Sequence, residues 1–139
     1  MSSTMHRRIT IAALAAAAVS TQLTPPTAGA ELHNITYIAR VDAVAPGSQA
    51  TFVTTDNQTN TAPLSSIPGN TFQADTVLAD PHQAGMHVSI RWPYAANVHC
   101  EIDVDDNVAT QVDQLVRPVP GSTDPMNGVL PCGAPLPNP

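Results

Sequence analysis

Three ionisable side chains occupy alternate positions in the segment from Val98 to Val104. His99, Glu101 and Asp103 alternate with apolar residues, so in a β-strand their side chains share one face, about 6.6 to 7 Å apart from one to the next. A divalent cation could bridge two of them. The other interpretation, which we favour, is an acidic, solvated strand face whose charge repulsion also opposes edge-to-edge aggregation. The sequence therefore gives only weak candidates for a metal site.

The two cysteines, Cys100 and Cys132, are the second chemically distinctive feature. An even number of cysteines in an exported chain predicts a disulfide, here closing a loop of about 33 residues that adds on the order of 3 to 4 kcal/mol. A metal site or a reactive thiol is the alternative, but neither cysteine has a Cys-x-x-Cys partner. We expect a disulfide.

No catalytic arrangement is evident. None of the serines lies in a Gly-x-Ser-x-Gly motif, and the sequence contains neither a glycine-rich phosphate loop nor a paired-cysteine zinc motif. We therefore predict a non-enzyme without a cofactor. A metal-dependent or hydrolytic envelope enzyme that uses His99, Glu101 and Asp103 is the alternative.

Trp92 and Tyr94 flank Pro93 at the expected end of a strand. The pair could form a surface for a ligand or partner. The only tryptophan of a small β-sandwich fills the core more often, and we favour that interpretation for Trp92.

The elements that must position these residues are strands. Period-two alternation or β-branched composition predicts strands over residues 34–41, 50–55, 71–78, 86–92, 98–104 and 108–116. Asp105, Asp106 and Asn107 form the expected hairpin turn, and Val108, Val112 and Val116 are expected on one face. Closely spaced strands with proline and glycine between them predict an all-β sandwich. Prolines and glycines after Arg117 predict no regular structure there.

The N-terminal residues 1–30 have the layout of a secretory signal. Arg7 and Arg8 precede an apolar run of about a dozen residues, and Ala28-Gly29-Ala30 provides small residues for cleavage. The run is short for a bilayer span, which needs about 20 residues, although a retained anchor is the alternative. We expect a secreted, periplasmic or cell-envelope protein. Its expected organisation is a signal peptide (1–30), a β-sandwich (31–118) and a proline-rich segment (119–139) tied down by the disulfide.

Charge limits the partners of the exported chain. Beyond residue 30, three arginines face eleven acidic residues, and the formal charge is −8. Nucleic acid and anionic lipid headgroups both require a basic surface, so the sequence argues against them.

The hairpin residues resemble a known family. The run from Cys100 to Asp105, a returning valine-rich strand and a last cysteine near the C-terminus resemble the periplasmic domain of the MmpS family of mycobacterial membrane proteins. Residues 35–41 and 50–53 are similar to that family's opening hairpin. The resemblance implies a small immunoglobulin-like sandwich that acts as an accessory or binding module for lipid or siderophore export, with an envelope protein or lipid-transport partner.

The chain departs from that family in three places. A cleavable-looking signal stands where the family has a membrane anchor, residues 105–107 replace an Asp-Gly turn, and a proline-rich insertion precedes Cys132. These departures fit a free secreted relative better than an obligate transporter subunit. The remaining alternative is a structural or antigenic secreted protein without a specific ligand.

Overall fold

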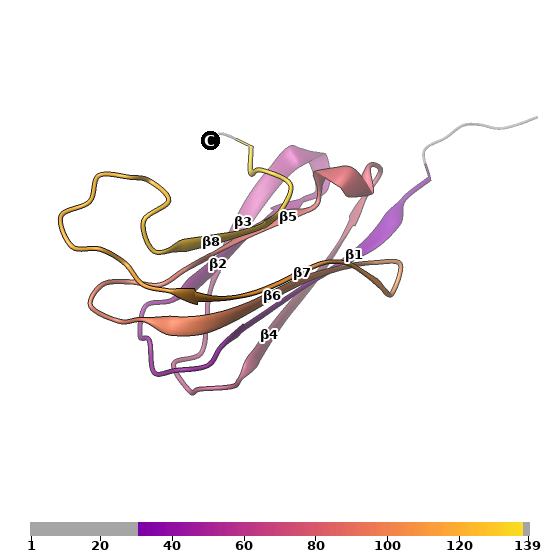
Figure 1. The fold of residues 1–139 in the computed structure, drawn as a ribbon. Coiled ribbons are helices and arrows are strands. Elements are labelled where there is room, and N and C mark those ends of the chain that lie inside the picture. The colour runs from indigo at the N-terminus through magenta and orange to yellow at the C-terminus, as the bar shows by residue number, and fades with distance from the viewer. Residues whose placement is uncertain (1–30, 138–139) are drawn as a thin grey trace, which may run out of the picture. The chain divides into compact units, whose positions relative to one another are not determined.

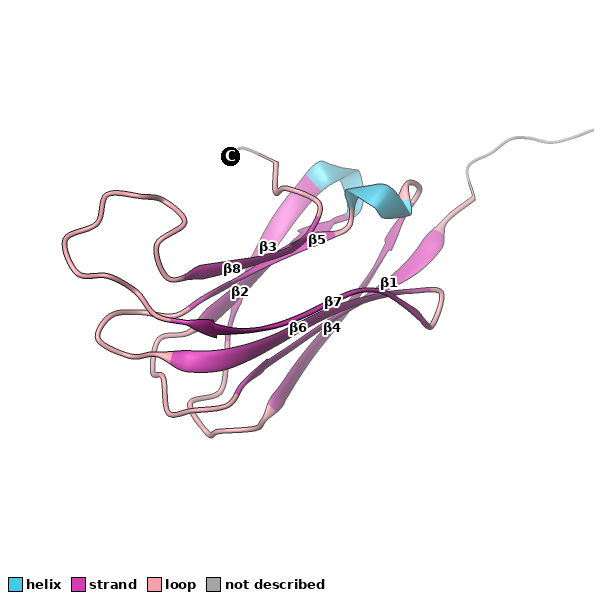
Figure 2. Cartoon of the chain, viewed as in Figure 1, coloured by secondary structure: helices cyan, strands magenta, loops and turns pink. Residues whose placement is uncertain are grey.

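The computed structural model describes residues 31–137, and the expected signal peptide lies outside the described residues. Eight strands and two short 3-10 helices form the described chain (Figure 2). In chain order they are β1 (His33–Val41), β2 (Gln49–Thr54), η3 (Thr55–Asn57), β3 (Gln58–Pro63), β4 (Thr71–Leu78), η4 (Pro81–Gln83), β5 (Gly85–Ser89), β6 (Ala96–Val104), β7 (Asn107–Val116) and β8 (Val129–Gly133).

The strands form two antiparallel four-stranded sheets that pack as a sandwich (Figure 1). One sheet has the order β4-β1-β6-β7 and the other the order β3-β2-β5-β8. The second order matches strands C′-C-F-G of an immunoglobulin variable domain, and β1 and β4 pair as strands B and E do. The β6–β7 hairpin takes the place of strand A. The predicted all-β sandwich is therefore confirmed, and its strand order is partly that of an immunoglobulin domain.

The core comes from the alternation that the sequence shows in β1 and β6. Ile35, Tyr37, Ala39 and Val41 are all buried on the inner face of β1, as are Val98, Cys100 and Ile102 in β6. Burial of these apolar side chains between two sheets is the main source of stability. The apolar residues at every second position of β1 and β6 thus form the inner face of the first sheet.

Tyr37 is the largest fully buried side chain. Its hydroxyl donates a hydrogen bond of 2.7 Å to the Val53 carbonyl in the opposite sheet, and its ring lies 5.2 Å from the Phe52 ring. Burial raises the pKa of Tyr37 to about 12, outweighing the opposite effect of a hydrogen bond to the Gly85 backbone. A polar contact therefore joins the two sheets inside the core.

The β6–β7 hairpin is confirmed, with one change of register. Asp105 and Asp106 form a two-residue turn with positive φ at both positions, and Asn107 already belongs to β7. A bulge then shifts the pairing, because Ile102 pairs with Thr110 whereas Asp103 pairs with Val108. Val108 consequently lies on the outer face and is 57% exposed. The expectation that Val108 shares a face with Val112 and Val116 is wrong.

Two strands that the sequence analysis did not predict complete the second sheet. β3 lies at an edge, and its first four residues are polar, so the sequence shows no strand pattern there. β8 contains Pro131, and it also lies at an edge, where proline is tolerated. The expected absence of regular structure after Arg117 is therefore wrong, and residues 129–133 belong to the sandwich.

The disulfide is confirmed. Cys100 on β6 and Cys132 on β8 are bonded, with their Cα atoms 6.3 Å apart and both residues buried. The bond crosses between the two sheets, so β8 is held both by pairing with β5 and by this covalent link.

Candidate functional site

Four loops meet at one end of the sandwich, which we call the loop end. These loops are residues 42–48, 64–70, 90–95 and 117–128. In the first sheet the strand ends that they join pair next to Val41, and in the second sheet they pair next to Ser89, so all four loops lie at the same end. Figure 1 shows them together, away from the β6–β7 turn. In immunoglobulin variable domains the corresponding end carries the antigen-binding loops.

Each loop presents a large apolar side chain to solvent. The exposed fractions are 60% for Val44, 62% for Ile67, 59% for Trp92, 38% for Tyr94, 57% for Val119 and 39% for Met126. Single exposed apolar residues are common, but six on the four loops at one end of the sandwich are a concentration of the kind that marks interaction sites. The loop end is therefore the candidate functional site.

Trp92 is exposed because β5 ends at Ser89, earlier than expected. Residues 91–94 form a turn with a cis Trp92–Pro93 bond, closed by a hydrogen bond of 2.9 Å from the Tyr94 N–H to the Arg91 carbonyl. The expectation that Trp92 fills the core is wrong, because its side chain is 59% exposed. Trp92 and Tyr94 instead stand together on the surface.

Sequence reasoning missed Val44, Ile67 and Val119. Each lies beside prolines or glycines, so the local sequence indicates only a turn. The signal that could have found them is an apolar residue at the tip of a predicted turn, repeated in several turns that the immunoglobulin topology brings to one end.

The backbone at two of these loop tips, Ile67 and Val119, is already hydrogen-bonded. Ile67 donates its N–H to the Ser65 hydroxyl at 3.1 Å, and its carbonyl accepts from the Asn70 N–H at 3.3 Å. The side-chain amide of Asn127 bonds both the N–H and the carbonyl of Val119, at 2.8 and 2.9 Å. Ile67 and Val119 therefore lie on loops whose local backbone geometry is fixed by these hydrogen bonds.

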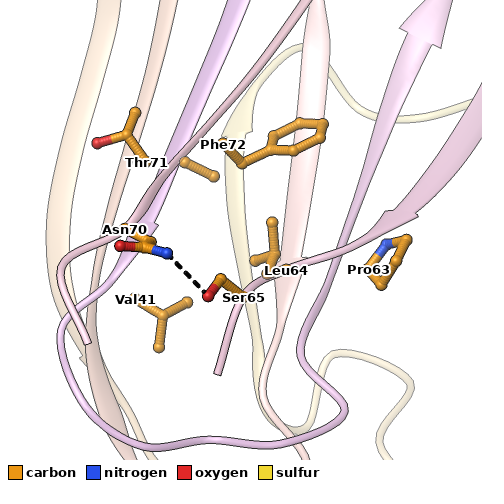
Figure 3. A pocket seen from close by; sticks show the side chains of 8 residues that line it. Val41, Pro63, Leu64, Ser65, Asn70, Thr71 and Phe72 are labelled. Atoms are coloured by element: carbon orange, nitrogen blue, oxygen red, sulfur yellow. Dashed lines mark hydrogen bonds between the residues drawn. The ribbon is translucent and has the colours of Figure 1, made fainter. Parts of the chain in front are cut away.

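A small hollow with both polar and apolar lining lies beneath the 64–70 loop. Its volume is about 200 Å³, and Val41, Leu64 and Phe72 border it, together with the hydrogen bond of 3.1 Å from Asn70 to the Ser65 hydroxyl (Figure 3). The hollow opens at the side of the sandwich between β4 and the end of β3. It is smaller than most pockets for drug-sized ligands.

The basic residues of the sandwich gather toward one end, whereas its acidic residues lie mainly at the other end and along the first sheet, where Asp75, Glu101, Asp103 and Asp113 are found. The arginines at positions 40, 91 and 117 all lie at the loop end or two residues before it, where Arg40 pairs with Asp42 at 2.9 Å. The opposite end of the sandwich carries a group of acidic residues: Asp56, Asp80, Asp105 and Asp106. Counting Asp42 and Asp124, the formal charge is +1 at the loop end and −4 at the other.

The predicted polar row on β6 exists, but it is less solvated than expected. His99 is only 7% exposed, and its ring nitrogens contact Asp113 at 2.8 Å and Glu101 at 3.1 Å. Both nitrogens are thus occupied, and both contacts are hydrogen bonds donated by the ring when the imidazole is protonated. Among residues 31–137, no three His, Cys, Asp or Glu side chains are grouped as a metal site.

Asp103, in the same row, has a raised pKa. Burial and the neighbouring Glu101 carboxyl, with a smaller effect of Asp106, raise the pKa of Asp103 to about 6. Its Oδ1 atom is buried and has no hydrogen-bond partner in the described part of the chain. Asp103 thus places a carboxyl with a raised pKa on the outer face of the first sheet.

The comparisons with known proteins add no family to this geometry: no protein-family model and no curated protein sequence matches the chain. Over residues 31–137, no helix combines the length and the apolar character that crossing a membrane requires.

Proposed function

We propose that this protein is a non-catalytic β-sandwich of the secreted or cell-envelope compartment that binds a partner through its loop end. The observation that carries the proposal is the group of six exposed apolar side chains on the four loops. The sandwich core behind them is closed by a disulfide, a feature typical of proteins in oxidising compartments. The fold also agrees with the MmpS resemblance, which suggests an accessory or binding module of an envelope export system.

Site-specific photo-crosslinking tests this proposal. A photoreactive residue is placed at position 92 or, as a matched control, at position 108, since Trp92 and Val108 are 59% and 57% exposed at opposite ends of the sandwich. Each chain is expressed in an exporting host and irradiated in envelope preparations. We expect a reproducible adduct with a protein or lipid from position 92 and none from position 108. Equal labelling from both positions would contradict a binding role for the loop end.

A further inference from the structure

We infer that the loop end docks on the surface of a lipid bilayer that contains anionic headgroups. This inference rests on the proposed function, because it names the partner of the same surface. The sequence argued against anionic lipid on the basis of total charge, but the structure shows that the charges are segregated.

The side chains at the loop end have the chemistry of a membrane interface. Trp92 and Tyr94 are amphipathic aromatic residues of the type enriched at the level of lipid headgroups. Val44, Ile67 and Val119 are aliphatic and project from separate loops. Shallow insertion of such side chains gains free energy in proportion to the apolar area removed from water.

The hydrogen bonding of two apolar residues at the loop end favours lipid over a protein partner. Hydrocarbon offers no hydrogen-bond partner, so a backbone group that enters it must be satisfied internally. Ile67 and Val119 meet this requirement at both their N–H and their carbonyl. A protein partner would supply such bonds itself, at about one for each 100 to 200 Å² of interface.

Charge orients the molecule on such a surface. Arg91 and Arg117 are exposed beside the apolar tips, where each can contact a phosphate. A group of acidic side chains lies at the opposite end of the strands, so repulsion by the same surface turns that end away. The two effects together select one docking orientation despite the negative total charge.

Vesicle binding tests the inference. The exported chain is mixed with vesicles of phosphatidylcholine and phosphatidylglycerol, or of phosphatidylcholine alone, and binding is measured by co-sedimentation and by fluorescence. Trp92 is the only tryptophan of the chain, so its emission reports directly on the loop end. Because the apolar run of residues 9–19 could also bind lipid if it is retained, the differences between variants provide the decisive readout.

We expect stronger binding to the anionic vesicles, with a blue shift of the Trp92 emission. Arg91→Gln should weaken that binding about fivefold, as expected for loss of one basic residue near the surface. Val119→Ser should weaken it about tenfold, whereas Val108→Ser, at a position that is equally exposed (57%) but remote, should leave it unchanged.

Two results would overturn the inference: no binding of the wild-type protein to anionic vesicles, or binding to which Arg91 and Val119 contribute no more than Val108. If either occurs while position 92 crosslinks specifically to an envelope protein, the loop end binds protein and the proposed function stands. If position 92 also gives no specific adduct, both proposals fail.

Discussion

Removal of the disulfide should have the largest effect on stability of the changes considered. Cys100 and Cys132 are 32 residues apart, and the bond removes roughly 12 cal/mol/K of entropy from the unfolded chain, which corresponds to ~3.7 kcal/mol at 25 °C. A domain of this size has a free energy of unfolding of about 5 to 15 kcal/mol. Loss of the bond should therefore lower the melting temperature by roughly 15 °C or more.

Urea denaturation provides the measurement, using the wild-type protein with and without a reductant and the double variant Cys100→Ala/Cys132→Ala. Alanine is chosen because a serine hydroxyl at these buried positions would need a hydrogen-bond partner. The reduced wild-type protein keeps both sulfur atoms, so its difference from the double variant measures packing alone. The double variant, which has no cysteine, must not respond to the reductant.

The loss should also be detectable in one strand. β8 pairs only with β5, so without the covalent link the Leu130 amide should exchange hydrogen faster than the amides of Tyr37 and Ile102 in the first sheet. A difference below about 1 kcal/mol between the oxidised and reduced wild-type protein would refute the reasoning from chain entropy.

Three further changes test individual features of the fold. The pKa of Asp103, about 6, exceeds its ordinary value near 3.8, so the native state binds protons more tightly and its free energy of unfolding should fall as pH rises from about 4 to 6. Asp103→Asn should abolish that fall and, after allowance for solvent screening, stabilise the protein by about 1 kcal/mol at neutral pH, as measured by urea denaturation across this range. Tyr37→Phe removes the buried hydrogen bond to Val53 and should cost about 1 to 2 kcal/mol in the same assay, and an unchanged midpoint would contradict that bond's role. Gly128→Ala should destabilise more than Gly69→Ala by about 1 to 3 kcal/mol, because φ is positive at both glycines but only at Gly128 does a Cβ atom meet a backbone carbonyl oxygen, at 2.5 Å. Equal thermal shifts of the two variants would show that the crowding at Gly128 is relieved without cost.

The central strands could be predicted from sequence because apolar and polar residues alternate in them, and the apolar ones are buried. Ile35, Tyr37, Ala39 and Val41 are apolar at every second position, and each faces the opposite sheet. The edges could not be predicted in this way. β3 buries none of its residues and is held by backbone pairing with β2, so its side chains carry no periodic signal.

The candidate site was predicted only in part. Trp92 and Tyr94 were identified by residue type, but the exposure of Trp92 depends on where β5 ends. Val44, Ile67 and Val119 are distant in sequence, and only the sheet topology brings their loops to one end. The polar row on β6 was placed on the correct face. The burial of His99 was not predicted, because its ring contacts Asp113 on the neighbouring strand β7 as well as Glu101.

The direction of the strands has a practical consequence for handling the protein. β1 begins at the end of the sandwich that carries the β6–β7 turn, so residues 32–33 lie away from the loop end. β8 ends there too, but the chain then turns back, and Leu136 and Pro137 lie beside Pro125 and Met126 of the 117–128 loop. A tag, dye or sensor chip joined next to residues 32–33 therefore leaves the loop end facing the bulk solution, whereas one joined next to residue 137 lies beside one of its loops. A comparison of the two attachment points in a biosensor measures how far crowding at that loop blocks binding.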